Sequence, residues 1–175
     1  MRKHGSSHLV LLALNLILFL GSSIECSAQA EQAQNRISQP VGGIFVRGFT
    51  RRHDGVDIGG NADAPVYSAY PGEVVEASSG CPNYRSDHCN GGFGNLVQIY
   101  HAPGMFTNYA HLTPGCALPR VGSQVTKQTQ IGCVGTSGHS TGPHLHFELI
   151  VGDHHVDPMN YLGGVIQLQI YPLVQ

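Results

Sequence analysis

Two histidines one residue apart, His144 and His146, point most directly to chemistry in this sequence. They lie in the segment STGPHLHFE (140–148), which has the character of a strand. Side chains at i and i+2 of a strand share one face, so both imidazoles should project to the same side. Leu145 and Phe147 should then point the other way, into an apolar core. The sequence therefore predicts a site on one face of a sheet.

A second pair, His53 and Asp57, stands far upstream and offers an imidazole and a carboxylate. With His146 these residues supply two nitrogens and one carboxylate oxygen, the ligand set of a catalytic zinc whose fourth position stays open to water. Alone, His53 beside Arg51 and Arg52 would be an ordinary surface histidine, and His146 could be a core histidine bonded to the backbone. A buried strand rarely places two histidines on one face without a cation or substrate, so metal ligation is favoured.

A third segment, Tyr109-Ala110-His111-Leu112, supplies one histidine more than the metal needs. In this order the three pieces resemble the lysostaphin/LytM-type zinc metallopeptidases, which cut peptide bridges in bacterial cell walls. The resemblance covers residues 41–162. It also includes Gly94-Asn95 before a strand, the segment GTSGHSTGP (135–143) and Asp157-Pro158. It implies a mostly β, single domain of antiparallel sheets with a long substrate groove.

The resemblance also implies a role for each of these residues. His53, Asp57 and His146 would hold one Zn²⁺ per chain, and His111 and His144 would be the catalytic histidines. A metal-activated water would be the nucleophile, with a histidine as general base and an imidazolium stabilising the oxyanion or protonating the leaving amine. Which histidine takes which part is open. Either could instead orient a ligand or the water without moving a proton.

The segment before the first ligand departs from the family pattern. Some members carry a tyrosine there that helps to hold the oxyanion, whereas residues 46–52 of this chain are VRGFTRR. Either Arg47 takes that part or the contribution is absent. We also expect Asn95, Tyr109 and Ser140 to bind substrate, because they lie at the approaches to the groove. For Asn95 and Ser140 the alternative is turn chemistry alone.

Residues 1–30 have the pattern of a secretory signal peptide. Arg2 and Lys3 are basic, residues 9–20 are apolar except for Asn15, and Ala28-Gln29-Ala30 gives small residues at the cleavage spacing. The apolar run is too short for a membrane helix, which needs about 20 residues. Cys26 would allow a lipid anchor, but Glu25 before it is a poor fit. The sequence thus predicts export to the periplasm or the extracellular space.

The remaining 145 residues suit one domain. We expect a polar leader over 31–40, the peptidase domain over 41–162 and a C-terminal tail over 163–175. Without the signal peptide, seven basic and ten acidic residues remain. This weakly acidic balance disfavours nucleic-acid binding, which usually needs a basic face. The sequence gives no oligomeric state.

Four cysteines remain after the predicted cleavage site, an even number that indicates two disulfides in an oxidising compartment. Of the three possible connectivities we expect the local one, Cys81 with Cys89 and Cys116 with Cys133, because each pair brackets a short loop. A cysteine-rich zinc site is disfavoured, since no Cys-x-x-Cys spacing occurs.

Short apolar runs separated by glycine and proline predict an all-β chain. We expect strands over 64–69, 73–77, 96–101 and 106–112, and compact strands that include Val121 within 121–134. No segment has sustained helical periodicity. The loop over 78–92, stapled by a disulfide, is either a wall of the groove or a plain surface insertion.

Together these patterns predict an exported zinc endopeptidase that hydrolyses peptide cross-links of peptidoglycan. The alternative is a catalytically silent wall-binding module of the same fold that activates another hydrolase or aids envelope assembly. All five site positions are filled, which favours the enzyme. The bond that is cut cannot be deduced from the sequence.

Overall fold

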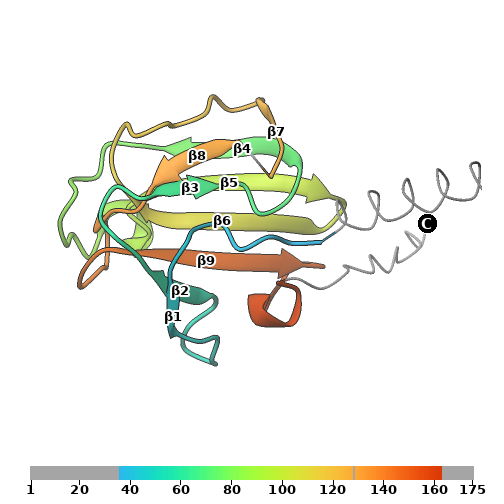
Figure 1. Cartoon of the computed structure of the whole chain (residues 1–175), viewed down its shortest axis with the longest axis horizontal. Coiled ribbons are helices and arrows are strands. Elements are labelled where there is room, and N and C mark those ends of the chain that lie inside the picture. The colour runs from blue at the N-terminus through green and yellow to red at the C-terminus, as the bar shows by residue number, and fades with distance from the viewer. Residues whose placement is uncertain (1–35, 128, 163–175) are drawn as a thin grey trace, which may run out of the picture. The chain divides into compact units, whose positions relative to one another are not determined.

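The computed structural model describes residues 36–127 and 129–162, and its regular structure is almost entirely β (Figure 1). The predicted signal peptide (1–30), the first half of the predicted leader and the predicted tail (163–175) lie outside the described residues. No helix in the described part of the chain is long and apolar enough to cross a bilayer.

The main sheet is antiparallel, with the strand order β1-β2-β9-β6-β5-β4-β7 and with β10 also paired to β9. A second sheet consists of β3 and β8. Figure 1 shows β9 and β6 side by side along the length of the domain, as their pairing requires. The strands are β1 (Ile44–Arg47), β2 (Val56–Gly59), β3 (Pro65–Tyr67), β4 (Gly72–Ser78), β5 (Asn95–Ala102), β6 (Met105–Leu112), β7 (Gln124–Val125), β8 (Gln130–Cys133), β9 (His144–Val151) and β10 (His154–Val156). Two 3₁₀ turns, η1 (Cys89–Gly92) and η2 (Pro158–Asn160), complete the described elements.

The core is built from the inward face of β9 and its neighbours. Leu145, Phe147 and Leu149 are fully buried, as the strand alternation predicts. The Phe147 ring packs on the ring of Tyr109 in β6, with centroids 5.3 Å apart. Val66 of β3 belongs to the same apolar cluster, so both sheets share one core. A one-residue slip of β9 would turn its histidines into this core, and burial of the apolar face therefore fixes the register that positions the site.

The predicted strands are present, with small shifts at their ends. The run over 121–134 contains β7 and β8, and Val125, Ile131 and Val134 are buried. The inclusion of Val121 among the packed residues was wrong, because its side chain is 62% exposed. It precedes a turn at Gly122, whose φ is +86°, and this turn carries Val121 away from the core.

The second half of the predicted leader is part of the domain and not a free segment. Ile37 is only 1% exposed, and it forms a parallel bridge with Leu162. The amide of Ser38 donates to the carbonyl of Ala69. Burial of an isoleucine side chain stabilises a fold by about 1.5–3 kcal/mol, so Ile37, together with buried Pro40, helps to hold this run against the domain.

Both predicted disulfides are confirmed with the local connectivity. Cys81 is bonded to Cys89, and Cys116 is bonded to Cys133. The first bond closes the loop between β4 and β5. The second joins the loop after β6 to the end of β8.

Candidate metal centre

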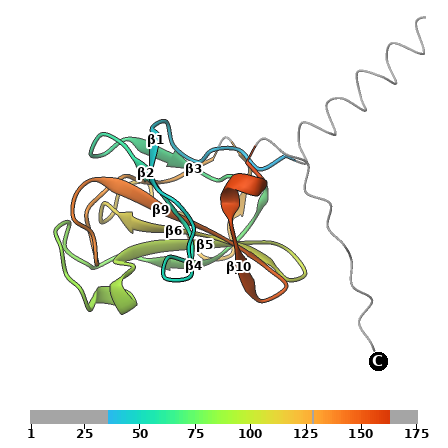
Figure 2. The same cartoon turned by 90° about the horizontal axis from the view of Figure 1, so that it is seen from below.

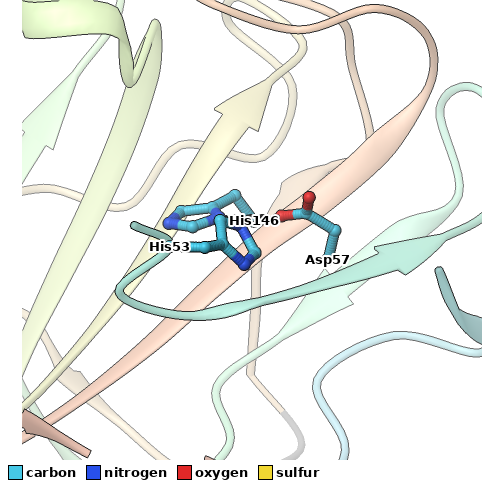
Figure 3. A group of neighbouring side chains, drawn as sticks. All are labelled: His53, Asp57 and His146. Carbon is cyan, nitrogen blue, oxygen red and sulfur yellow. Dashed lines mark hydrogen bonds and ion pairs between the residues drawn. The ribbon is translucent and has the colours of Figure 1, made fainter. Parts of the chain in front are cut away.

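Three side chains, from β2, from β9 and from the turn before β2, meet at one point (Figure 3). Asp57 lies on β2 directly opposite His146 on β9, because the two strands pair in that register. His53 precedes β2 in a tight turn, held by reciprocal backbone hydrogen bonds with Thr50. All three residues are buried, with exposed fractions of 7% for each histidine and 6% for Asp57. This is the group that the sequence predicted as metal ligands, and its donor atoms lie close enough to share one ion.

The atoms that the three residues point at one another are all hydrogen-bond acceptors. This follows from the hydrogen bonds that the two histidines make on the sides facing away from the group. His53 Nδ1 lies 2.8 Å from the carbonyl oxygen of Gly48, so it must donate, which leaves Nε2 with a lone pair. His146 Nε2 lies 3.0 Å from Oε1 of Glu148, which leaves Nδ1 as the free nitrogen. His53 Nε2 and His146 Nδ1 are 3.1 Å apart, and they lie 3.0 and 2.8 Å from Oδ1 of Asp57.

Three lone pairs that face one another in a buried space repel unless a cation lies among them. That cation is either a proton or a metal ion. Two imidazole nitrogens and one carboxylate oxygen match the donors that zinc prefers, and three protein ligands leave a position for water or substrate. The residues present therefore fit the metal that the sequence predicts.

Glu148 belongs to this centre although the sequence analysis gave it no role. Its side chain is 2% exposed and accepts from Asn108 Nδ2 through Oε2 at 2.7 Å, besides its contact with His146. His155 approaches the same oxygen at 3.3 Å from β10. A signal was available, because Glu148 is two residues from His146 and so shares its face of β9. The contact fixes which nitrogen of His146 faces the centre.

The electrostatic interactions within the centre favour a negative Asp57 and a positive His146. Burial by itself raises the pKa of Asp57, but the hydrogen bond and charge of His146 outweigh it, and the net pKa is lowered. Burial likewise disfavours the charged form of His146, yet hydrogen bonds to Asp57 and Glu148 raise its pKa to about 9. In the metal-free protein, one proton therefore lies where the ion would bind, and metal binding must displace it.

His111 and His144 lie beside this group on neighbouring strands, with ring centroids 4.8 Å apart. Each ring is oriented through Nδ1, which lies 2.8 Å from the carbonyl of Ser137 for His111 and 2.8 Å from that of Gly142 for His144. Nε2 of each ring is therefore the free nitrogen. His111 sits at the end of β6 with φ of +62°, a conformation that costs a non-glycine residue energy and often marks a functional site.

Burial is the main reason why the pKa of His111 falls to about 4, and the neighbouring charges of His144 and His146 lower it further. A histidine with this pKa is neutral at pH 7, so its Nε2 is available as an acceptor. The arrangement combines a three-donor cation site with two imidazoles that are each oriented through Nδ1.

An open cleft of about 580 Å³ lies over these residues. One wall comes from two loops that are joined to each other: Ser86 N donates to Gly138 O, and His139 N donates to Gly92 O, both at 2.7 Å. Gly138 has φ of +73°, and an added Cβ would lie 2.3 Å from the carbonyl oxygen of Gly92. Gly91, Gly92 and Phe93 line the cleft, so the stapled loop ends as a groove wall, and it is not a plain surface insertion.

The family assignment follows from the same segments. Residues 51–158, which contain every residue of the centre and both oriented histidines, match the model of peptidase family M23. The chain belongs to peptidase family M23. The predicted resemblance to lysostaphin/LytM-type metallopeptidases and the predicted antiparallel β fold are thereby confirmed.

Known M23 proteins resemble the chain in sequence and structure. It is 37% identical over 128 residues to the DD-carboxypeptidase/endopeptidase Mpg of Neisseria meningitidis, a match that covers 71% of this chain and 26% of Mpg. A zinc-containing peptidase from Vibrio cholerae superimposes with a TM-score of 0.61 at 28% identity, over 72% of this chain and 40% of that structure. Lysostaphin from Staphylococcus simulans gives a TM-score of 0.58 at 26% identity, over 81% and 60%. The chain thus spans about a quarter of the length of the curated relative.

Within this M23 domain, the three residues predicted to bind substrate all have structural contacts, and their binding of substrate stays a prediction. Asn95 is buried, accepts from the amides of Gly80 and Cys81, and donates to the carbonyls of Cys81 and Leu112. The hydroxyl of fully buried Tyr109 accepts from the amide of Ala69. Neither residue lines the cleft.

Ser140 is also buried, and its hydroxyl donates to the carbonyl of Gly142. The same hydroxyl lies 3.3 Å from Nδ1 of His144. Its position indicates that it holds the loop that orients His144. The motif placed Ser140 near the site correctly, but the direction of its side chain depends on a turn that the spacing does not define.

Three histidines outside the motif also form contacts within the fold. His155 contacts Glu148 as described. His101 has both ring nitrogens hydrogen-bonded, Nδ1 to the carbonyl of Pro71 at 2.8 Å and Nε2 to the hydroxyl of Thr107 at 2.7 Å. His139 is exposed and lies 3.0 Å from Asp87.

Proposed function

We propose that this M23 domain is a zinc-dependent endopeptidase that hydrolyses peptide cross-links of bacterial peptidoglycan. The observation that carries the proposal is the pairing of a buried three-donor cation site with two oriented histidines, His111 and His144, that leave Nε2 free in the same cleft. The name of Mpg, a DD-carboxypeptidase/endopeptidase, supports the substrate class. The zinc in the related Vibrio cholerae peptidase supports the choice of metal.

His53, Asp57 and His146 would hold the single zinc ion, and His111 and His144 would act on protons. When bound, zinc would polarise the scissile carbonyl and lower the pKa of a coordinated water. His111, neutral at pH 7, can accept a proton at Nε2, and the imidazolium that forms can donate it to the leaving amine. His144 can hydrogen-bond the developing oxyanion or share the proton transfer through its own Nε2.

The proposed location is the periplasm or the extracellular space. Two disulfides within a small domain are typical of exported proteins, since cytosolic thiols are kept reduced. Residues 1–30 would be removed on export. The intact mass should be that of a chain that begins at or near Glu31 and contains two disulfides. Four free thiols in protein recovered from its native compartment would contradict export.

Digestion of purified cell walls tests the activity. Zinc-loaded protein should release new amino groups and no new reducing sugars, because an amide is cut and not a glycosidic bond. Walls of different cross-link chemistry, followed by mass spectrometry of the released ends, would identify the bond. If no wall type releases amino groups while a partner hydrolase is stimulated, the domain is the silent wall-binding module.

A further inference from the structure

Two arginines line the cleft beside the candidate metal centre, and neither has a part in the catalysis proposed above. Arg47 ends β1, and Arg52 immediately precedes His53. We propose that these guanidinium groups bind a carboxylate that the substrate peptide carries close to the scissile bond, so that the enzyme prefers peptides with a negative charge at that position. This inference rests on the proposed peptidase function and specifies its substrate.

The backbone places Arg47 on the same side of the sheet as the metal centre. β1 pairs with β2, and the residue opposite Arg47 is Asp57. Directly opposed residues of an antiparallel pair project to one face, with Cβ atoms about 4.5–5.5 Å apart. The register shifts between Phe45 and Arg47, which is the sign of a bulge. Bulges next to active sites re-aim side chains, and here the bulge turns Arg47 toward the cleft.

Arg52 is fixed from the other side by the turn that also positions the first ligand. Thr50 and His53 exchange backbone hydrogen bonds at 3.0 and 3.1 Å, so Arg51 and Arg52 form the tip of a tight turn. The amide of Arg52 donates to the hydroxyl of Thr50 at 3.3 Å. Only the second of the two turn residues lines the cleft, which makes Arg51 a natural control.

Both guanidinium groups are exposed, and over residues 36–127 and 129–162 neither takes part in an ion pair or side-chain hydrogen bond. The nearby acids are otherwise engaged: Asp57 contacts two histidines and Glu148 contacts His146 and Asn108. Asp54 also lines the cleft, and it forms no ion pair with either arginine. Among the described residues, no carboxylate therefore pairs with the two guanidinium groups that line the cleft.

The local charge contrasts with the rest of the chain. Of the seven basic residues after residue 30, three are Arg47, Arg51 and Arg52, in a chain whose acidic residues outnumber the basic ones. Arginine stays charged at all accessible pH values and matches a carboxylate with two parallel hydrogen bonds. A peptide can offer that carboxylate in two ways, as its free C-terminus or as a side chain next to the scissile bond.

Two pairs of synthetic peptides separate these sources. The first is acetyl-Lys-D-Ala-D-Ala with a C-terminal carboxylate or carboxamide. The second is acetyl-Lys-D-Ala-D-Asp-amide and its D-Asn counterpart, which place the charge on a side chain. For at least one pair, the zinc-loaded wild type should show kcat/KM at least about tenfold higher for the charged member. The pair with the larger ratio identifies the source of the carboxylate.

Arginine variants then assign the effect to these residues. In Arg47→Gln and Arg52→Gln, the kcat/KM for the charged peptide divided by that for the neutral peptide should fall toward one, mainly because KM for the charged peptide rises. Arg51→Gln should keep the wild-type ratio. Arg47→Lys should retain part of the preference, because it keeps the charge but loses the paired hydrogen bonds. A ratio near one in the wild type for both pairs overturns the inference. So does an Arg47→Gln variant that lowers kcat equally for both members, since this would give Arg47 the oxyanion role.

A binding measurement keeps this inference separate from the catalytic proposal. The same four peptides, made with a CH₂–NH link in place of the scissile amide, cannot be hydrolysed, and their dissociation constants can be measured by calorimetry with the full metal-loaded chain. Tighter binding of the charged members by wild type and Arg51→Gln, lost in Arg47→Gln and Arg52→Gln, supports the inference even if no peptide is cut. Equal binding of charged and neutral members contradicts it even if the protein is an active peptidase.

Discussion

His146 bonds through Nε2 to Oε1 of Glu148 at 3.0 Å, so Nδ1 is the nitrogen that faces His53 and Asp57. A buried carboxylate behind a ligand fixes the ring and its tautomer, and such partners typically change metal affinity by 10–100-fold when lost. We therefore expect Glu148→Gln to weaken zinc binding by at least about tenfold with the fold retained. Competition with a fluorescent chelator measures the affinity.

The control for this variant is His155→Gln. His155 contacts the outer oxygen of the same carboxylate and is itself exposed. Its loss should leave zinc affinity within about threefold of the wild type, because Asn108 still holds Glu148. Equal effects of the two substitutions would mean that Glu148 acts only through general stability and does not orient His146.

Replacement of a ligand itself should have a larger effect. Asp57→Ala removes the only carboxylate of the three-donor group, and we expect zinc content after dialysis to fall from about one per chain to near zero. Metal analysis of the folded variant decides this, with Asp54→Ala as the neighbouring control. Full occupancy and affinity in Asp57→Ala would show that the carboxylate is not a ligand.

Local periodicity accounts for most of what the sequence could predict. In β9 every second residue enters the core, so the face of His144 and His146 followed from Leu145 and Phe147 alone. The disulfide pairing could also be predicted from local sequence, because each bond closes a short loop. β2, in contrast, alternates only over Val56-Asp57-Ile58, with Val56 and Ile58 in the core and Asp57 at the candidate metal centre, and this run is too short to predict a strand.

Contacts between residues that are far apart in the sequence could not be predicted from local periodicity. Ile37 lies in a polar run, and its burial depends on pairing with Leu162 at the other end of the domain. The inward direction of Tyr109 is set by the backbone amide of Ala69, forty residues away. Motif spacing placed Tyr109 near the site, but it could not show which side chains face the cleft and which support it.

The disulfide between Cys81 and Cys89 should matter more for activity than for the metal. Its short loop contributes about 2.5 kcal/mol in the chain-entropy model, and the same loop ends in the cleft wall at Gly91 and Gly92. We expect the double alanine variant to keep its zinc but to lose at least about tenfold in kcat/KM, since about 1.4 kcal/mol of lost positioning is tenfold.

The second disulfide provides the matched control. Cys116 and Cys133 do not line the cleft, so their double alanine variant should lose comparable stability and keep most of its activity. Denaturant melts and peptide hydrolysis, measured on the same samples, separate the two effects. Equal activity losses in both variants would contradict the prediction that the Cys81–Cys89 bond supports activity through the cleft wall.

The stability of the fold should depend on His101 at mildly acid pH. Burial lowers the pKa of His101 to about 4, against 6.5 in an unfolded chain. Between these values the unfolded state binds a proton that the folded state does not, so stability is complete above pH 6.5 and falls as the pH drops toward 4. With its ring partly exposed, His101 should account for roughly 2 kcal/mol of this loss.

Denaturant unfolding across pH 4–6.5 measures that contribution as the difference in slope between wild type and His101→Gln. The variant should show a shallower decline, although it is less stable at pH 7 because the contacts with Pro71 and Thr107 are altered. His139→Gln, at an exposed position, should keep the slope of the wild type. Identical slopes in wild type and His101→Gln would contradict the buried neutral imidazole.

The central claim is that His111 and His144 act in catalysis, by proton transfer or by stabilising the oxyanion, in a cleft whose metal is held by other residues. The most direct test is amide hydrolysis of purified walls by wild type, His111→Ala and His144→Ala at matched zinc content, with the folding of each confirmed by circular dichroism. Both variants should keep most of their zinc and release amino groups at least about a hundredfold more slowly, the low end for loss of general acid–base catalysis. Near-normal turnover by either zinc-loaded variant would contradict the account, because that histidine would then be only architectural.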